Sequence, residues 1–202
     1  MNIAVIGSGG HTRSLVNILK RYFVDPDIGI YDDSFTSFGE FIGGYPVLGR
    51  LERISRAAVV ILSKGDNQIR KTLYDKYIEQ VCIENLVHVN AFVEQDGEIG
   101  FSNQIFANAY INSSVRIGCN NIINTSAILE HEVVIGSHNH ISVNAVLCGR
   151  VEIGSGCFIG ASATIKDQIK ICDNVVIGAG GVVVKNIDQP GVYAGVPCRK
   201  IK

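Results

Sequence analysis

The sequence has no excess of positive charge, no long apolar run and no C-x-x-C pair among its six cysteines. Eighteen basic and 19 acidic residues give a net charge of −1, so the positive field that binds a nucleic-acid backbone is missing. The first residues lack the basic segment of a secretion signal, and no span reaches the length of a membrane helix. The cysteine spacing favours reduced thiols over a disulfide scaffold. We therefore expect a cytoplasmic protein that neither binds nucleic acid nor enters a membrane.

A strict period of six residues runs through the second half of the chain. Every sixth position carries a branched aliphatic side chain, at Val87, Val93, Ile99, Ile105, Ile111, Ile117, Ile123, Leu129, Ile135, Ile141, Leu147, Ile153, Ile159, Ile165, Ile171, Ile177 and Val183. An α-helix would repeat every three to four residues and a strand every two. A period of six therefore indicates a chain that turns a corner after each hexad.

A period of eighteen residues lies on top of the first. Small residues stand two positions before the aliphatic on one set of hexads, at Ala109, Ala127, Ala145, Ala163 and Gly181. The three faces of each coil can thus be told apart, which predicts a triangular parallel β-helix with strands about 4.8 Å apart. Glycines and asparagines near the corners are expected to supply positive φ angles, the asparagines being Asn103, Asn120, Asn121, Asn139, Asn144 and Asn174.

The first 80 residues alternate short apolar runs with helical patterns. The predicted strands cover 2–6, 28–31 and 57–62, and the predicted helices cover 12–22 and 67–78. This order is typical of a small parallel α/β sheet, whose ligands bind at the carboxyl ends of the strands. The glycine-rich loop at 7–11 is therefore a candidate phosphate or nucleotide site. The alternative is that its glycines only form a tight turn between strand and helix.

Three of the five histidines lie within ten residues, at His131, His138 and His140. His131 comes two residues after the axial Leu129, at a corner, and should point away from the β-helix. It stands between two glutamates, and a carboxylate can fix the tautomer of a histidine, so His131 is a candidate general base. A metal site made by the three histidines and an ordinary surface histidine are the competing interpretations.

Several motifs follow one another in a fixed order along the chain. They are G-S-G-G-H at 7–11, Y-D-D at 31–33, G-D-N-Q-I-R-K at 65–71, N-T-S at 124–126, E-H-E at 130–132, His140, and G-V-Y-A-G-V-P at 191–197. Together they resemble the nucleotide-sugar acetyltransferases of the bacillosamine pathway, a hexapeptide-repeat family that includes NeuD-type sialic acid O-acetyltransferases and GDP-perosamine N-acetyltransferases. The resemblance implies a Rossmann-like nucleotide-sugar-binding domain at 1–82 and a left-handed parallel β-helix with the acetyltransferase site at 83–202.

The resemblance also implies the reaction. It is acetyl transfer from acetyl-CoA to the 4-amino group of a nucleotide-linked 4-amino-4,6-dideoxy sugar, UDP-linked by preference, in the synthesis of bacterial surface glycans or glycoproteins. His131 matches the base of the family and Glu132 the residue that supports it. No metal and no covalent acyl-enzyme are expected. Acetyl-CoA lies between neighbouring β-helices in this family, which implies a homotrimer.

Two binding surfaces follow from the same resemblance. The residues that match the nucleotide-sugar surface are Gly9, His11, Asp32, Asp33, Gly65, Asn67, Arg70 and Asn124. Those that match the acetyl-CoA surface are His140, Gly149, Ala161, Gly178, Gly180, Gly195, Pro197 and Arg199. The backbone N–H of Gly149 is a candidate oxyanion donor. Thr12-Arg13 and the residues near CoA depart from the family pattern, which leaves the sugar and the nucleotide open.

Three other functions remain compatible with the sequence. The first keeps the fold and acetylates a hydroxyl of a sialic-acid-type or capsular sugar. The second is a non-catalytic binding or assembly protein, because a fold does not guarantee a chemistry. The third is a zinc enzyme like the γ-carbonic anhydrases, which would need three correctly spaced histidine ligands.

Overall fold

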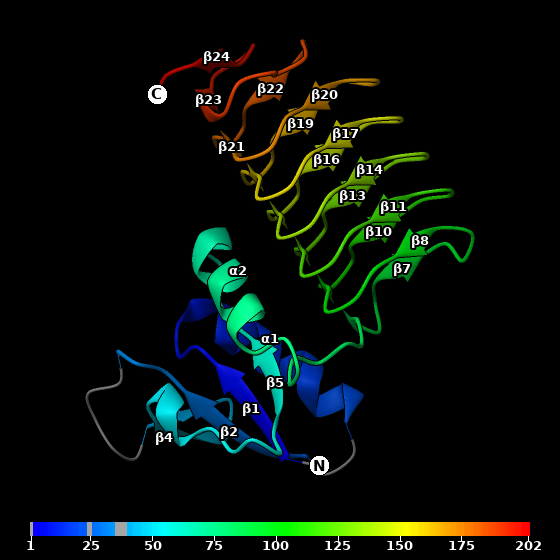
Figure 1. Ribbon diagram of the computed structural model, residues 1–202. Helices are drawn as coiled ribbons and strands as arrows, with labels where there is room; N and C mark the ends of the chain where they lie inside the picture. Colours follow the sequence, from blue (N-terminus) through cyan, green and yellow to red (C-terminus); the bar gives the residue numbers. More distant parts are fainter. Residues whose placement is uncertain (1, 24–25, 35–39) are drawn as a thin grey trace. The chain divides into compact units, whose positions relative to one another are not determined.

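The computed structural model describes residues 2–23, 26–34 and 40–202. The chain divides into two compact units, Met1–Leu86 and Val87–Lys202. The first contains the two α-helices and the second is built from short strands (Figure 1). Within the described residues, neither helix combines the length and the apolar composition that crossing a membrane requires.

The first unit is a five-stranded sheet flanked by helices, with strand order β3-β4-β2-β1-β5. The strands are β1 (Asn2–Ile6), β2 (Asp27–Tyr31), β3 (Phe41–Ile42), β4 (Tyr45–Gly49) and β5 (Val59–Leu62). The helices are α1 (Gly10–Tyr22), the 3-10 turn η1 (Leu51–Arg53) and α2 (Asn67–Lys76). All strand pairs are parallel except β3 with β4. The inner strand β1 is apolar from its second residue onward because both of its faces are covered.

The predicted α/β pattern of this unit is confirmed, with shifted boundaries and one omission. Helix α1 begins at Gly10 rather than at residue 12, β5 begins at Val59 rather than at 57, and α2 ends at Lys76 rather than at 78. The hairpin of β3 and β4 was not predicted. Its strands meet at two glycines with positive φ, and β3 has only two residues, too few to show a period of two.

The second unit is a parallel β-helix with three ladders of short strands (Figure 1). The first ladder contains β7 (Phe92–Val93), β10 (Tyr110–Ile111), β13 (Ile128–Leu129), β16 (Val146–Leu147), β19 (Thr164–Ile165) and β22 (Val182–Val183). The second contains β8 (Glu98–Ile99), β11 (Arg116–Ile117), β14 (Val134–Ile135), β17 (Glu152–Ile153) and β20 (Lys170–Ile171). The third contains β6 (Leu86–Val87), β9 (Gln104–Ile105), β12 (Ile122–Ile123), β15 (His140–Ile141), β18 (Phe158–Ile159), β21 (Val175–Ile177), β23 (Gly191–Ala194) and β24 (Arg199–Lys200).

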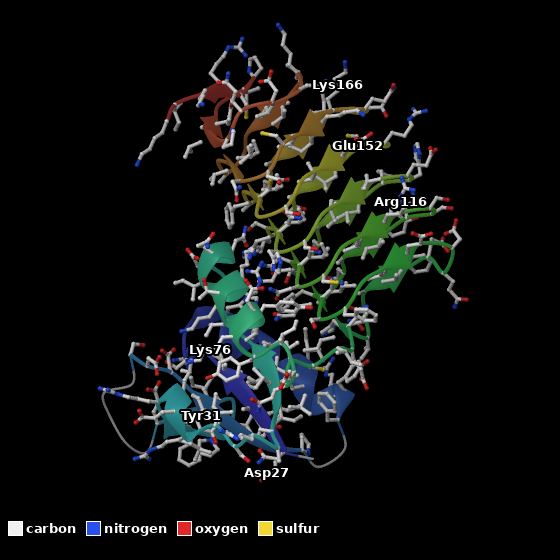
Figure 2. All side chains as sticks on the ribbon, viewed as in Figure 1. Asp27, Tyr31, Lys76, Arg116, Glu152 and Lys166 are labelled. Atoms are coloured by element: carbon white, nitrogen blue, oxygen red, sulfur yellow. The ribbon has the colours of Figure 1, made fainter. Side chains whose placement is uncertain are left out.

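The aliphatic of each hexad ends a strand and points to the axis, as the six-residue period predicts. Ile117, for example, pairs with Ile135, which pairs with Ile153 one coil further on. From the hexad of Ile105 onward all these aliphatics are buried, and they form one continuous core. On the second ladder the residue before the aliphatic is exposed at Glu98, Arg116, Glu152 and Lys170, and Figure 2 shows the charged ends of Arg116 and Glu152 directed away from the coils. The architecture fits the left-handed β-helix of hexapeptide repeats that was expected.

The corner prediction was correct for only half of the asparagines. Positive φ recurs at every sixth residue, and the positions are Ser102, Asn108, Ser114, Asn120, Ser126, Glu132, His138, Asn144, Arg150, Gly156, Ser162, Gln168, Asn174 and Gly180. The prediction is wrong for Asn103, Asn121 and Asn139. Each of them directly follows a positive-φ residue, and its side chain is buried within the corner.

These three asparagines form a hydrogen-bonded ladder along the β-helix. The backbone N–H of Asn121 donates to Oδ1 of Asn103 at 2.8 Å, and that of Asn139 donates to Oδ1 of Asn121 at 2.8 Å. The N–H of Cys157 continues the ladder by donating to Asn139 at 2.7 Å. The side chains thus accept hydrogen bonds from backbone donors that are buried within the corner.

Candidate active site

His131 and Glu132 lie together at a corner of the β-helix, just after β13. Nδ1 of His131 is 3.1 Å from Oε2 of Glu132, and the side chains are 47% and 56% exposed. Glu132 has a φ of 60°, one of the corner angles described above. A carboxylate that accepts a hydrogen bond from Nδ1–H leaves Nε2 of the imidazole as the proton acceptor. The histidine predicted to point outward is therefore half-exposed and has a carboxylate partner at Nδ1.

Gly149 lies directly above His131, one coil of eighteen residues later. A Cβ atom at Gly149 would be 2.5 Å from Cε1 and 2.6 Å from Nε2 of His131. The imidazole therefore lies across the glycine, and any side chain there would displace it. Within residues 2–23, 26–34 and 40–202, the N–H of Gly149 has no protein hydrogen-bond partner. A backbone donor thus stands beside the ring of the candidate base.

One coil beyond Gly149, Asp167 adds a charged partner to this corner. Its side chain accepts from Gln168 at 2.7 Å and lies 3.4 Å from a guanidinium nitrogen of Arg150. The hydrogen bond from Gln168, followed by the charges of Arg150 and His131, holds the pKa of Asp167 below its usual range. The carboxylate therefore stays ionised and adds a negative charge to this corner.

A second pair of predicted site residues is also in contact. Nδ2 of Asn124, assigned to the sugar side, is 3.1 Å from Nε2 of His140, assigned to the acetyl-CoA side. His140 is nearly buried, at 8% exposure, and its ring packs edge-to-face on Phe158 with centroids 5.1 Å apart. The amide and the aromatic ring together fix the orientation of this imidazole. The two predicted surfaces therefore meet at one point.

The remaining residues assigned to acetyl-CoA gather around the last coil. The N–H of Gly180 donates to the carbonyl of Ala161 at 2.8 Å, and a Cβ at Gly178 would lie 3.1 Å from Cβ of Ala194. The carbonyl of Gly195 accepts from the N–H of Val182 at 3.1 Å. The chain then passes the cis peptide before Pro197 and returns through β24, which carries the exposed Arg199.

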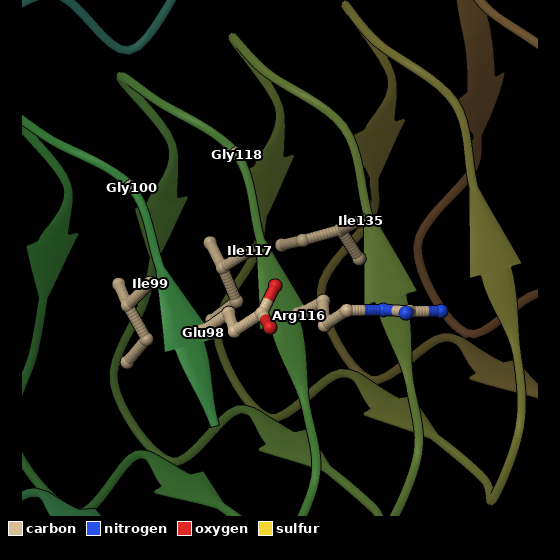
Figure 3. Close-up of a pocket in the computed structure, with 7 residues that line it drawn as sticks. All are labelled: Glu98, Ile99, Gly100, Arg116, Ile117, Gly118 and Ile135. Carbon is tan, nitrogen blue, oxygen red and sulfur yellow. The ribbon is translucent and has the colours of Figure 1, made fainter. Parts of the chain in front are cut away.

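The surface of the β-helix includes the two hollows that follow. One of about 360 Å³ is lined by Val183, Val184, Lys185, Asn186, Ile187, Tyr193, Cys198, Arg199 and Lys200. The other, of about 460 Å³, lies on the second ladder and is lined by Glu98, Ile99, Gly100, Arg116, Ile117, Gly118 and Ile135 (Figure 3). The first includes Arg199 of the predicted acetyl-CoA surface. The lining of the second includes none of the site residues predicted from sequence.

In the first unit, Gly9 and His11 lie where the glycine-rich loop enters α1. Gly9 is the N-cap residue of α1, and no side chain caps this end of the helix with a hydrogen bond. A Cβ at Gly9 or at Gly10 would meet no atom within 4 Å, so both glycines face open space. No acidic residue stands in the first turn of α1. Negative charge is stabilised at such a helix end.

Asp32 follows β2 and is buried, with an exposure of 5%. Burial by itself would raise the pKa of Asp32, but hydrogen bonds from Lys64, Ser34 and Ser8 outweigh this effect and hold it well below the usual range. Asp33 is exposed, and its Oδ1 accepts from the N–H of Leu51 at 3.0 Å, at the start of η1. Both predicted substrate carboxylates therefore have structural partners within the unit.

Arg70 is a fully buried side chain, although it was predicted to bind substrate. Its guanidinium donates to the carbonyls of Lys64 at 3.1 Å and Gly65 at 3.4 Å, and to Oδ1 of Asn67 at 2.9 Å. Burial lowers the pKa of Arg70 to about 10, and the charge of Asp66 offsets part of that effect. The structure thus brings Gly65, Asn67 and Arg70 together, with Arg70 holding the loop between β5 and α2.

Sequence reasoning did not single out Ser8 or Lys64, which both bind Asp32. Lys64 Nζ lies 2.8 Å from Oδ2 of Asp32, and the N–H of Ser8 donates to the same oxygen at 2.8 Å. A charged residue two positions after an apolar strand was the signal that could have identified Lys64. Within the described part of the chain, no three His, Cys, Asp or Glu side chains are grouped as metal ligands would be.

The sequence matches two family models. One is the PglD N-terminal domain, over residues 2–77, and the other is the bacterial transferase hexapeptide with six repeats, over residues 150–185. No curated protein matches the chain significantly.

Solved structures resemble the whole chain. The acetyltransferase domain of PglB from Neisseria gonorrhoeae FA1090 is 26% identical, with a TM-score of 0.89 over 99% of both chains. PerB from Caulobacter crescentus, in complex with CoA and GDP-perosamine, is 26% identical, with a TM-score of 0.89 over 100% of this chain and 98% of that one. WeeI from Acinetobacter baumannii AYE shares the fold at 21% identity, with a TM-score of 0.89 over 100% of both chains.

Proposed function

Because the chain combines a PglD N-terminal domain with the hexapeptide repeats of bacterial transferases, we propose that it transfers the acetyl group of acetyl-CoA to the amine of a nucleotide-linked amino sugar. The observation that carries the proposal is the pair His131 and Glu132, with the imidazole lying across Gly149. This arrangement supplies a base, a carboxylate that orients it and a backbone donor at one corner.

The full-length structural relatives support the choice of substrates. The PglB domain has been solved with acetyl coenzyme A, and PerB with CoA and GDP-perosamine. Perosamine N-acetyltransferase is the activity named for the Caulobacter protein. The chain spans nearly the full length of both solved chains, so both of its units have counterparts in them.

The proposed mechanism is direct transfer. The free amine of the sugar attacks the thioester carbonyl while Nε2 of His131 takes the amine proton. Glu132 keeps the opposite ring nitrogen protonated and stabilises the imidazolium that forms. The N–H of Gly149 donates to the oxyanion of the tetrahedral intermediate. When the C–S bond breaks, the proton passes from His131 to the CoA thiolate, which leaves as the thiol.

Within this class, we assign a UDP-linked 4-amino-4,6-dideoxy sugar of bacterial surface-glycan or glycoprotein synthesis as the first acceptor to test. Asn124 and the loops after β1, β2 and β5 would bind the sugar nucleotide. His140 and the surface around Gly178, Gly180 and Gly195 would bind acetyl-CoA. The assembly proposed is a homotrimer, which light scattering coupled to size-exclusion chromatography measures directly.

The test is a panel assay. The protein is mixed with acetyl-CoA and UDP-, GDP- and CMP-linked amino and hydroxy sugars, and release of the CoA thiol is followed. We expect turnover of a nucleotide-linked 4-amino sugar. His131→Ala should reduce kcat roughly 100- to 10,000-fold, the usual contribution of a general base, and should leave acetyl-CoA binding intact.

His138→Ala is the matched control, because His138 is also a corner histidine, bonded to Asn120 at 2.9 Å. It should retain most of the activity. If only hydroxyl acceptors are turned over, the protein is an O-acetyltransferase and the proposed N-acetylation is wrong. An unchanged rate in His131→Ala would exclude this histidine as the base.

A further inference from the structure

Three polar residues occupy the same edge of the first sheet. Strand β1 lies between β2 and β5, with Ile6 in register with Tyr31 on one side and Leu62 on the other. Ser8, Asp32 and Lys64 follow the ends of these three parallel strands. In open α/β sheets, ligands bind outside the carboxyl ends of the strands. The three side chains therefore stand where the proposed nucleotide sugar is expected.

The carboxylate of Asp32 is fully engaged within the protein. Its Oδ2 accepts from Lys64 Nζ at 2.8 Å, from the N–H of Ser8 at 2.8 Å and from Oγ of Ser8 at 3.0 Å. Its Oδ1 accepts from the N–H and from Oγ of Ser34, at 3.1 and 2.8 Å. Two carboxylate oxygens have about four lone-pair sites, and five donors already occupy them. Little acceptor capacity remains for a ligand hydroxyl.

Lys64 is in the opposite situation. An ammonium has three N–H donors, and within the described ranges of the chain Asp32 is the only side-chain partner of Lys64. Its side chain is 26% exposed. The stem runs beside the glycine-rich loop, because a Cβ at Gly7 would lie 3.4 Å from Cδ of Lys64. A cation with spare donors is thus held next to a loop in which Gly9 and Gly10 face open space.

We propose that Lys64 contacts the diphosphate of the nucleotide-linked sugar, and that Asp32 is a positioning residue that holds Lys64 and Ser8 in place. This inference rests on the proposed function. A lysine ammonium binds phosphate oxygens as a point charge, and the ion pair with Asp32 limits the conformations of its long side chain before the ligand arrives. The ammonium of Lys64, which follows β5, therefore contacts the sugar nucleotide. Asp32 affects nucleotide binding only by positioning Lys64.

The test measures binding alone, by calorimetric titration of UDP and GDP into the full chain. Lys64→Met should raise the Kd of the nucleotide that binds by about tenfold or more, because a hydrogen bond to a charged group is lost. Lys64→Arg should recover most of the affinity. Lys71→Met is the matched control, since Lys71 makes an exposed ion pair of the same 2.8 Å length with Asp75 in the same unit.

A double-mutant cycle separates the roles of the two residues. Asp32→Asn alone should raise the Kd of the nucleotide, but in the Lys64→Met background it should raise that Kd little further. The Kd of acetyl-CoA, measured in parallel, should stay the same in all variants and reports on the β-helix, and unchanged hydrogen exchange in β5 and α2 reports that the α/β unit is folded. An unchanged nucleotide Kd in Lys64→Met overturns this inference and leaves the proposed function standing. If neither nucleotide binds the wild-type chain, this inference fails, and the proposed function fails as well if the panel assay also shows no turnover of a nucleotide-linked amino sugar.

Discussion

The two units satisfy their buried polar groups in different ways. In the β-helix, each asparagine of the ladder binds a partner eighteen residues away. In the α/β unit, Asp32 binds partners 24 and 32 residues away, on two other strand ends. Repetition makes the first arrangement visible in the sequence. The second depends on a sheet topology that brings unrelated positions together, so polar networks in the two units differ in how far sequence can reveal them.

This difference determines which features of each unit could be predicted from the sequence. The axial aliphatics and the small residues before them follow from periodicity because each position meets its own copy one coil away. The inward turn of Asn103, Asn121 and Asn139 was missed because asparagine suits positive φ and buried ladders equally well. The partners of Asp32 and the burial of Arg70 require the fold of the loops, which no local pattern contains. The contact of Asn124 with His140 likewise depends on the coil register.

Arg70→Met should have the largest effect on stability and should affect only the α/β unit. The variant leaves two backbone carbonyls and the amide of Asn67 without their donor, at a cost of about 3 kcal/mol. Hydrogen exchange followed by mass spectrometry should show faster exchange in β5 and α2. The β-helix should keep its protection. Equal loss of protection in both units would show that they unfold together and would break the comparison.

Gly149→Ala should reduce activity by roughly ten- to hundredfold, because a methyl group must displace the imidazole of His131. Steady-state kinetics with the best acceptor from the panel should show the loss mainly in kcat. The same substitution in His131→Ala should have little further effect, since no ring is left to displace. A full additive loss in the double variant would assign Gly149 a role independent of the ring.

Asn121→Ala should destabilise the β-helix by about 1 to 2 kcal/mol without changing the acetylation rate. It removes an acceptor for the N–H of Asn139, which is buried in the ladder. Urea unfolding monitored by the β-sheet signal reports the change. Asn17→Ala, at an exposed position of α1, is the control and should be nearly neutral. Equal effects at the two positions would argue against the ladder as a source of stability.

Acid should destabilise the α/β unit through protonation of Asp32, and this is the smallest effect of the series. Because folding lowers the pKa of Asp32, its stabilisation is complete well above the unfolded carboxyl value of about 3.9 and is lost as the pH falls below it. Hydrogen exchange in β1 and β2 should therefore accelerate between about pH 4 and pH 2. Asp32→Asn should make this dependence shallower. An identical acid response in the variant would show that other carboxylates are responsible.

The recurring left-handed corner residue has a consequence for how such a site can be relocated. Ser114, Arg150 and Gln168 adopt φ values of 60°, 59° and 64°, against 60° for Glu132. The backbone that displays the histidine and glutamate pair is thus already present on neighbouring coils, and only the side chains distinguish them. A reactive pair could be moved along the axis by eighteen residues at a time, in steps of about 4.8 Å. The position of an active site along the axis of a β-helix can therefore change only in whole coils, and side-chain substitutions can make that change without altering the main chain.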